Sequence, residues 1–326
     1  MAGAVEQMQF PVEPRTTEQA DLSVEGLLLD VDKFASHDGP GIRTTVFLKG
    51  CPLSCIWCHS PESRLNHAEL IYHPDRCQGC LVCTEVCPKD ALHIADGAGS
   101  QSITIDRSQC DVCGKCIEVC YHGALRVAGR TVTVGEVVKE VRKDIAYFQA
   151  SGGGVTLSGG EPARQPAFSY NFLMACQAEG IHTAVETTGY ARWQVMEALA
   201  HVTDLFLYDL KFADAAAHKQ YTGVDNRIIF ENLQRLVQMG REIHVRVPCI
   251  SGVNDSQEQI DAIARAVADL GLSKIVLLPY NSAAGAKYEW LGYDFALPYA
   301  KTQSDEKMKA LADICRRSGL TVSIGG

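Results

Sequence analysis

Residues 50–60 read Gly-Cys-Pro-Leu-Ser-Cys-Ile-Trp-Cys-His-Ser, and they follow an apolar, β-branched run, Thr44–Lys49, that is expected to form a strand. The three cysteines of this stretch, Cys51, Cys55 and Cys58, are separated by three and then by two residues. Three thiolates are one fewer than a four-iron cluster can bind, so one iron stays open for a substrate or cofactor, as the open position of a catalytic zinc does. A zinc or structural site that uses His59 as a fourth ligand is the alternative.

The composition is that of an ordinary globular protein, with 326 residues of which 46% are hydrophobic and 21% charged. Because 39 acidic residues outnumber 30 basic ones, we expect no surface that neutralises nucleic-acid phosphates. No apolar stretch approaches the roughly 18–20 residues of a membrane span, and the N-terminus lacks the apolar core of a signal peptide. These features predict a cytoplasmic chain whose partners are proteins or small molecules.

Cysteine is the most informative residue type, because 11 of the 14 cysteines lie between Cys51 and Cys120. In a reducing compartment such clustering favours metal binding over disulfides. Eight of them form two quartets with two, two and three intervening residues, the spacing of bacterial two-cluster ferredoxins, in which the fourth cysteine of each run ligates the other cluster. Zinc, which also binds four thiolates, is the alternative metal. The predicted sets are Cys77, Cys80, Cys83 and Cys120 for one four-iron cluster, and Cys110, Cys113, Cys116 and Cys87 for the second.

Strand-like and helix-like segments alternate from Thr131 to the C-terminus, after a first predicted strand at Gly26–Phe34. A capping-box pattern, Thr133 with Glu136, marks the start of one helix. This alternation predicts an α/β fold with parallel strands, in an open sheet or a partial barrel, and places the chemistry at the carboxyl ends of the strands. The later predicted strands are Val155–Ser158, Ile181–Glu186, Leu205–Leu210, Ile243–Val247, Lys274–Pro279 and Leu320–Ile324, and the clearest helices are Glu231–Met239, Gln257–Leu270 and Asp305–Arg317.

The stretch around the first three cysteines resembles the signature of radical S-adenosylmethionine (SAM) enzymes, through Cys51, Cys55, Ile56, Trp57 and Cys58. The preceding Ser36-His37-Asp38-Gly39-Pro40-Gly41-Ile42-Arg43, with Phe47 and Gly50, resembles in particular the enzymes that activate glycyl radical enzymes. The resemblance extends from about Gly26 to the C-terminus. It implies a partial (β/α)6 radical-SAM barrel over residues 23–70 and 129–326, a ferredoxin-like insertion over 71–128 and a flexible tail over 1–22. One departure is Ser60, where the short activating enzymes usually have Asn.

The resemblance also implies a SAM site at the barrel mouth. Gly159 and Gly160 would let the backbone approach the methionine end closely, and the Glu161 carboxylate would accept a hydrogen bond from the SAM ammonium. In pyruvate formate-lyase activase Asp takes the place of Glu186, and its surroundings include a monovalent cation, which becomes a candidate ligand here. Asn281 stands where that enzyme has His, and Asn cannot titrate. The SAM-binding residues implied in this way are Trp57, Gly159, Gly160, Glu161, Glu186, Thr187, Asp209, Lys211, Arg246 and Asn281.

The implied function is activation of a partner glycyl radical enzyme. Reductive cleavage of SAM would give a 5'-deoxyadenosyl radical, which removes hydrogen from a glycine Cα of the partner. The implied cofactors are three 4Fe-4S clusters and SAM, with reduced flavodoxin or ferredoxin as electron donor. Two other interpretations remain at this point: a radical-SAM enzyme that acts directly on a small molecule or peptide, and a ferredoxin-like electron carrier on an inactive barrel. The sequence does not indicate which glycyl radical enzyme is served.

Overall fold

A computed structural model describes residues 19–95 and 102–325. Most of the predicted tail, residues 1–18 of 1–22, lies outside this part of the chain. The described chain is built on a nine-stranded sheet with the order β13-β12-β11-β10-β9-β8-β2-β1-β7. Its strands are β1 (Glu25–Ala35), β2 (Arg43–Leu48), β7 (Arg130–Thr133), β8 (Gly154–Gly159), β9 (His182–Thr187), β10 (Leu205–Asp209), β11 (Glu242–Cys249), β12 (Lys274–Pro279) and β13 (Thr321–Ile324).

In the order of the sheet, every pair of neighbouring strands from β2 through β8 to β13 is parallel. The sheet is therefore parallel except at one edge. At that edge β1 pairs antiparallel with both β2 and β7. The predicted α/β class with parallel strands is therefore confirmed, as a mixed and open sheet whose end strands are β13 and β7. Because parallel strands point the same way, their carboxyl ends meet on one side of the sheet, where the polar strand-end residues gather.

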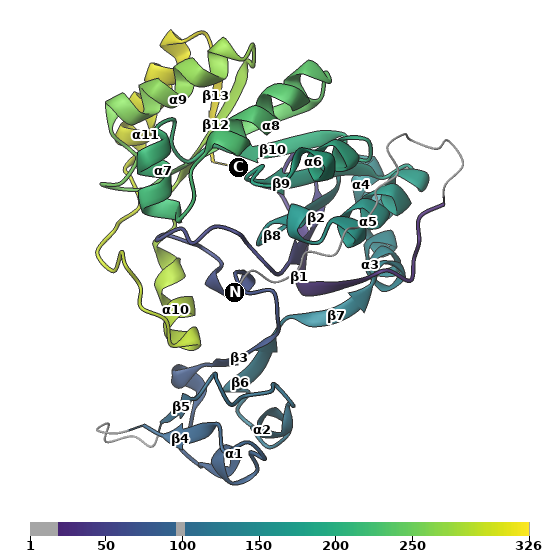
Figure 1. Cartoon of the computed structure of the whole chain (residues 1–326), viewed down its shortest axis with the longest axis vertical. Coiled ribbons are helices and arrows are strands. Elements are labelled where there is room, and N and C mark those ends of the chain that lie inside the picture. Colours follow the sequence, from purple (N-terminus) through teal and green to yellow (C-terminus); the bar gives the residue numbers. More distant parts are fainter. Residues whose placement is uncertain (1–18, 96–101, 326) are drawn as a thin grey trace.

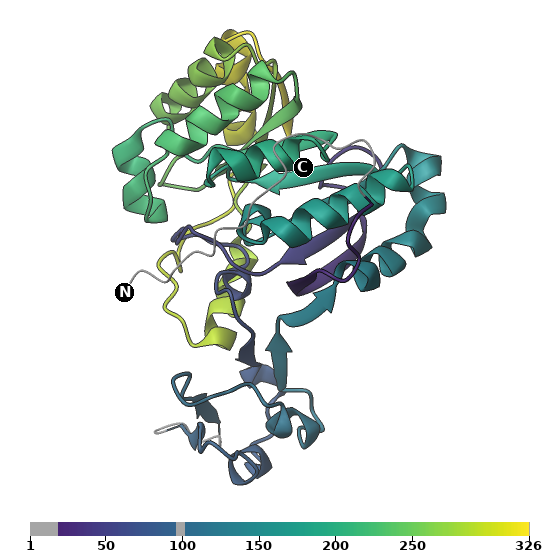
Figure 2. The same cartoon turned by 45° about the vertical axis from the view of Figure 1, so that its right-hand side comes forward.

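Helices connect the parallel strands and cover the sheet (Figures 1 and 2). Helix α3 begins with the predicted capping box, in which Thr133 and Glu136 bond each other's backbone and side chain. The predicted helix at Glu231–Met239 is confirmed, but it begins four residues earlier, at Arg227. The helices of this layer are α3 (Val134–Val141), α4 (Ile145–Ser151), α5 (Pro166–Ala178), α6 (Trp193–Ala200), α7 (Ala215–Thr222), α8 (Arg227–Gln238), α9 (Gln257–Asp269) and α11 (Asp305–Arg317).

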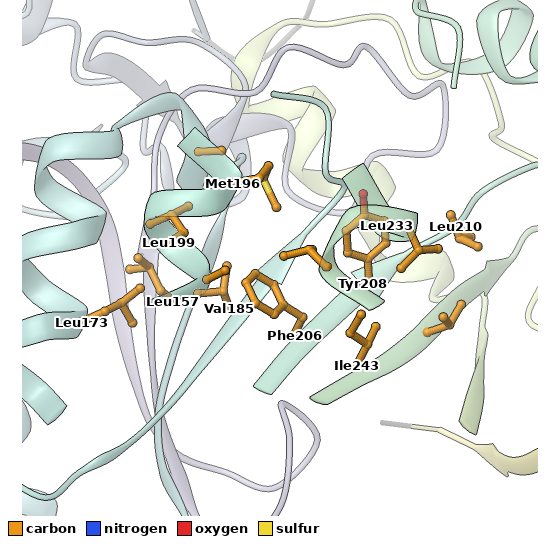
Figure 3. Close-up of a cluster of buried hydrophobic side chains, with 14 of the residues drawn as sticks. Leu157, Leu173, Val185, Met196, Leu199, Phe206, Tyr208, Leu210, Leu233 and Ile243 are labelled. Atoms are coloured by element: carbon orange, nitrogen blue, oxygen red, sulfur yellow. The ribbon is translucent and has the colours of Figure 1, made fainter. Parts of the chain in front are cut away.

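The main hydrophobic core lies between these helices and the sheet. Leu157, Val185 and Phe206, from the adjacent strands β8, β9 and β10, lie beside the helix residues Leu173 and Leu199 in Figure 3. Such fully buried strand runs are typical of parallel sheets covered by helices. Tyr208 of β10 is also buried in this core, and its hydroxyl donates to the carbonyl of Ile229 at 2.7 Å. The core thus fixes the strands whose far ends carry the site.

The segment between residues 69 and 128 forms small elements of its own below the main sheet (Figure 1). It leaves and rejoins the larger sheet through two antiparallel strands, in which Glu69 lies opposite Ala128. Five cysteines of the quartets pack, partly buried, around a small core that includes Leu70 and Leu92, and a sixth, Cys116, is buried within it. The elements are β3 (Glu69–Tyr72), α1 (Val82–Glu85), β4 (Leu92–Ile94), β5 (Ile103–Ile105), α2 (Lys115–Glu118) and β6 (Leu125–Ala128).

A buried ion pair holds this segment to the sheet. Lys49, the residue after β2, is fully buried, and its Nζ lies 2.9 Å from Glu69 Oε2. The Lys49 stem passes Gly129, whose φ is +97° and where a Cβ would come within 2.4 Å of Lys49 Cδ, so only glycine fits there. Helix α10 (Gly285–Leu291) lies against the same junction, because Tyr293 just beyond it donates to Glu69 Oε1.

Candidate functional site

The loop that carries Cys51, Cys55 and Cys58 follows β2 at the carboxyl side of the sheet. Burial raises the pKa of Cys51 and of Cys55 to about 12, and it raises the pKa of Cys58 as well. The neighbouring thiols of Cys55 and Cys58 also raise the pKa of Cys51, and the Cys58 thiol raises that of Cys55. A metal centre would supply the positive charge that these partly buried thiols need in order to ionise.

Lys211 and Asp209 extend from the end of β10 toward this loop. Their side chains pair at 2.9 Å between Lys211 Nζ and Asp209 Oδ2. Burial alone would lower the pKa of Lys211, but Asp209 and the Cys55 and Cys51 thiols raise it above its ordinary value. The lysine therefore stays charged beside the cysteine loop. Asp209 Oδ1 is buried and has no hydrogen-bond partner among the described residues.

Arg246 of β11 faces Glu186 of β9. Arg246 Nη1 lies 3.3 Å from Glu186 Oε1 as an ion pair, but without the alignment of a hydrogen bond. Burial raises the pKa of Glu186, and Arg246 opposes that shift. Ser158 of β8 donates to the other carboxylate oxygen of Glu186 at 2.6 Å. Two guanidinium nitrogens of Arg246, Nε and Nη1, are buried without a hydrogen-bond partner in the described chain, which leaves donors free for a polar ligand.

Glu161 is fully buried, and its carboxylate is used entirely by the chain itself. Oε1 accepts hydrogen bonds from Thr187 Oγ1 at 2.6 Å and from the amide of Ala163 at 3.2 Å. Oε2 accepts from the amide and the hydroxyl of Thr188, at 2.8 and 2.7 Å. A carboxylate has about four acceptor positions, so none is left for an ammonium group. The role expected for Glu161 as an acceptor from SAM does not fit this geometry, and the residue instead fixes the end of β9.

The paired glycines pack closely against the backbone before the cysteine loop. Gly159 has φ +112°, and a Cβ on it would lie 2.2 Å from the Leu48 carbonyl oxygen. A Cβ on Gly160 would lie 2.4 Å from the carbonyl oxygen of Gly50. The amide of Gly160 donates to Leu48, and that of Glu161 donates to Gly50. The glycines therefore let the end of β8 pack against the backbone that leads into the cysteine loop.

Trp57 and Asn281 occupy different surroundings. Trp57 is buried in an apolar cluster with Phe212, Ile250 and Tyr280. Asn281 is exposed, and its Oδ1 accepts from the amide of Ala283, so it caps the short turn after β12. Next to it, the Tyr280 hydroxyl is buried with no partner in the described residues.

Tyr288 of α10 is a residue that the sequence analysis did not select. Its hydroxyl donates to the Cys58 carbonyl at 3.1 Å, which ties α10 to the cysteine loop. It lies beyond the last predicted strand of the site, and an isolated tyrosine in a helix gives no signal in a single sequence. The neighbouring Lys287 pairs with Glu62, just after the loop, at 2.6 Å.

The cysteines of the quartets lie close to one another. Burial raises the pKa of Cys83, and so do the nearby thiols of Cys120, Cys77 and Cys80. The remaining four cysteines line one recess in the surface of the segment between β3 and β6. These four are Cys87, Cys110, Cys113 and Cys116.

Among the described residues, no three His, Cys, Asp or Glu side chains converge as the ligands of a single metal ion do. Four thiolates on one zinc lie about 4 Å apart, since each Zn–S bond is about 2.3 Å. A four-iron cluster places each thiolate on a different iron and needs a wider set. The donor set, which is all thiol in each of the three groups, fits such clusters.

The comparisons with known proteins agree with this site. Residues 45–267 match the family model of the Radical SAM superfamily. The chain belongs to this superfamily. It is similar to the trans-4-hydroxy-L-proline dehydratase activating enzyme of Clostridioides difficile, with 38% identity over 92% of this chain and 99% of that protein. It is also similar to the benzylsuccinate synthase activating enzyme of Thauera aromatica (39% identity, 92% of each chain) and to the isethionate sulfite-lyase activating enzyme of Oleidesulfovibrio alaskensis (43%, 88% of this chain and 93% of that protein).

Within the radical SAM superfamily, the chain falls among the activating enzymes of glycyl radical enzymes, as the resemblance implied. Membership implies a 4Fe-4S cluster and SAM as cofactors, and it makes the chain an enzyme of the oxidoreductase type. No helix in the described ranges has the length and apolar character that crossing a membrane requires.

Proposed function

We propose that this protein activates a glycyl radical enzyme by reductive cleavage of SAM. The observation that carries the proposal is the grouping of three partly buried thiols, Cys51, Cys55 and Cys58, beside Lys211 on the side of the sheet where Asp209 and Arg246 keep polar atoms without a hydrogen-bond partner. Thiols alone would suit an electron carrier. The additional unpaired donor and acceptor suit a site that also binds a zwitterion such as the methionine end of SAM.

The chain's own residues have distinct roles in this proposal. The free nitrogens of Arg246 would bind the SAM carboxylate, and Asp209 Oδ1 would accept from the ammonium group. Glu161 acts as a positioning residue, because its four hydrogen bonds fix Thr187 and Thr188 at the strand end. Arg246 already balances the charge of Glu186, so a monovalent cation is not needed at that carboxylate. Trp57 would contribute apolar surface beside the cluster.

Cys51, Cys55 and Cys58 would hold the barrel cluster, which when bound would supply the one electron needed to cleave SAM into methionine and a 5'-deoxyadenosyl radical. That radical takes one hydrogen atom from a glycine Cα of the partner, giving 5'-deoxyadenosine and a glycyl radical. The partner must present its glycine at the mouth where Lys211 and Arg246 lie, so a segment of it has to leave its own core.

The test is 5'-deoxyadenosine formation by the anaerobically reconstituted protein, supplied with SAM and a strong reductant. Cys55→Ala is the control, because it removes one of the three barrel ligands. We expect formation that is lost in the control. An unaltered rate in Cys55→Ala, or no product despite a full complement of iron, would contradict the proposal. Appearance of a glycyl-radical signal in a co-incubated enzyme would then identify the partner.

We also propose that residues 71–128 form a ferredoxin-like module with two further 4Fe-4S clusters, giving three in the protein. The neighbouring thiols of Cys83 and Cys120 support one set, and the recess lined by Cys87, Cys110, Cys113 and Cys116 supports the other. The module would pass electrons from reduced flavodoxin or ferredoxin to the barrel cluster. Cys113→Ala tests this relay, since activity with the protein donor should fall. Unchanged activity with flavodoxin or ferredoxin would rule the relay out.

A further inference from the structure

The carboxyl end of helix α7 holds the cysteine loop by three hydrogen bonds. The amide of Ser54 donates to the Thr222 carbonyl at 2.8 Å, and the amide of Ile56 donates to the Tyr221 carbonyl at 3.1 Å. The Ser54 hydroxyl also donates to Thr222, at 3.3 Å. The two amides that flank Cys55 in the sequence are therefore both committed to the helix.

This commitment bears on the electronic properties of a cluster bound at Cys55. Hydrogen bonds from backbone amides to the sulfurs, together with solvent access, are among the factors that set the reduction potential of an iron–sulfur cluster. Each amide that donates to a sulfur stabilises the more negative, reduced state. Amides that donate to helix carbonyls cannot do so, and the reduced state is left less stabilised.

The same helix limits water on this side of the loop. Tyr221 of α7 stacks on Phe212, with ring centroids 5.3 Å apart and 10° between the planes. Phe212 in turn lies 6.1 Å from the Trp57 ring. Cys55 and Ile56 pack, partly buried, against this aromatic group. An apolar surface next to Cys55 disfavours added negative charge. It therefore lowers the reduction potential of the cluster, as the loss of amide donors does.

We propose that the carboxyl end of α7 keeps the barrel cluster at a low reduction potential, by taking the Ser54 and Ile56 amides away from its sulfurs and by adding Tyr221 to the apolar cluster against which Cys55 packs. A strongly reducing cluster is what reductive cleavage of a sulfonium requires. The inference rests on the proposed barrel cluster, but not on the identity of any partner. Ser54, Tyr221 and Gly223 are thus positioning residues for the redox step.

Gly223 gives a precise way to disturb this contact. It ends α7 with φ +86°, and a Cβ on it would lie 2.4 Å from Ser54 Oγ. Gly223→Ala should therefore displace the Ser54 hydroxyl, break its hydrogen bond to the Thr222 carbonyl and loosen the contact between the loop and the helix. Removing Oγ relieves the clash, because the next Ser54 atom is 3.7 Å away, so Ser54→Ala/Gly223→Ala should restore the contact. Gly240→Ala is the matched control: it has φ +69° after a helix, with nothing within 4 Å of its added Cβ.

The measurement is a reductive titration of the full-length reconstituted protein, followed by low-temperature EPR, in which the wave missing from Cys55→Ala identifies the barrel cluster. We expect its midpoint to shift to a more positive potential in Gly223→Ala. It should stay near the parent value in Gly240→Ala and return toward it in the double variant. Equal midpoints in Gly223→Ala and Gly240→Ala would overturn the proposal.

Should Gly223→Ala fail to retain the cluster, Tyr221→Leu decides the matter. It keeps the backbone carbonyl and removes only the stacked ring, so the midpoint should again become more positive, and an unchanged midpoint would overturn the proposal. Failure here is distinguishable from failure of the proposed function, because the titration needs neither SAM cleavage nor a partner. If the Cys55-dependent wave were absent from the parent protein, the barrel cluster itself would be wrong.

Discussion

The Tyr293 hydroxyl donates to Glu69 Oε1 at 2.6 Å and so joins the end of α10 to the first strand of the cysteine-rich segment. The other oxygen of Glu69 pairs with Lys49 of the main sheet. Arg107, from the same segment, donates to the carbonyls of Leu291 and Leu70. Three parts of the chain that are far apart in the sequence thus meet at one carboxylate. This carboxylate fixes how the cysteine-rich segment stands on the sheet.

Glu69→Gln should therefore be strongly destabilising. It leaves the ammonium of Lys49, which is fully buried, without a compensating charge, and breaking a buried pair in this way costs about 3–5 kcal/mol. Denaturant unfolding of the iron-free chain measures the loss. Asp313→Asn is the matched control, because its pair with Arg316 is exposed and its removal should change stability by less than about 0.5 kcal/mol. Similar effects of the two variants would contradict the importance of the buried pair.

Glu161→Gln separates a positioning role from direct contact with SAM. The amide group of Gln would place donors against Thr187 or Thr188, which already donate, so we expect a loss of stability of about 1–3 kcal/mol together with a fall in SAM cleavage. Thermal unfolding and 5'-deoxyadenosine formation are the two readouts. Lost SAM binding with full parental stability would indicate instead that Glu161 contacts SAM.

The two proposed cysteine sets predict which variants lose the same cluster. Cys83→Ala and Cys120→Ala should give identical reduced EPR spectra, each with about four fewer irons per chain. Cys87→Ala and Cys113→Ala should give a second, different spectrum. Cys176→Ala, which removes a buried thiol in the main core, should keep all the iron. Matching spectra for Cys83→Ala and Cys87→Ala would reverse the assignment.

His218 predicts how stability depends on pH. It is buried in α7, burial lowers its pKa, and its Nδ1 lies 2.7 Å from the Val224 carbonyl. Below about pH 6.5 the unfolded chain binds a proton that the folded chain does not, so this residue contributes a loss of stability as the pH falls. His218→Asn should make the stability of the iron-free chain less dependent on pH between about 5 and 7. The measurement is the free energy of unfolding of both proteins at several pH values. The same dependence on pH in both proteins would refute the prediction.

Much of the fold could be predicted because its signals are local. Strands such as Lys274–Pro279 are short apolar runs between polar turns, and the helix Asp305–Arg317 begins directly after a capping serine, Ser304. The strands β4 and β5 were not predicted, because they have only three residues each and depend on pairing with each other. Pairing between distant segments leaves little trace in a single sequence.

The sequence predicted which strand ends carry the polar residues of the candidate site, but not the orientations of their side chains. Sequence and resemblance placed Glu161 and Asn281 at strand ends, where the structure has them. Which way a carboxylate or amide points depends on competing partners, and here Thr188 and Ala283 supply them. Arg246 differs from these two residues. The described chain gives it too few acceptors, so two nitrogens of its guanidinium have no hydrogen-bond partner.

The antiparallel pairing of β3 with β6 has an evolutionary consequence. Because Glu69 lies opposite Ala128, the chain enters and leaves the cysteine-rich segment at points about 5 Å apart. A gene could therefore gain or lose the whole segment as one cassette, with a tight turn closing the gap and the parallel strands undisturbed. The residue at position 49 should then differ between chains with and without the segment. A lineage without the cassette would have no Glu69 to neutralise a buried ammonium, and it should carry an uncharged residue at this position.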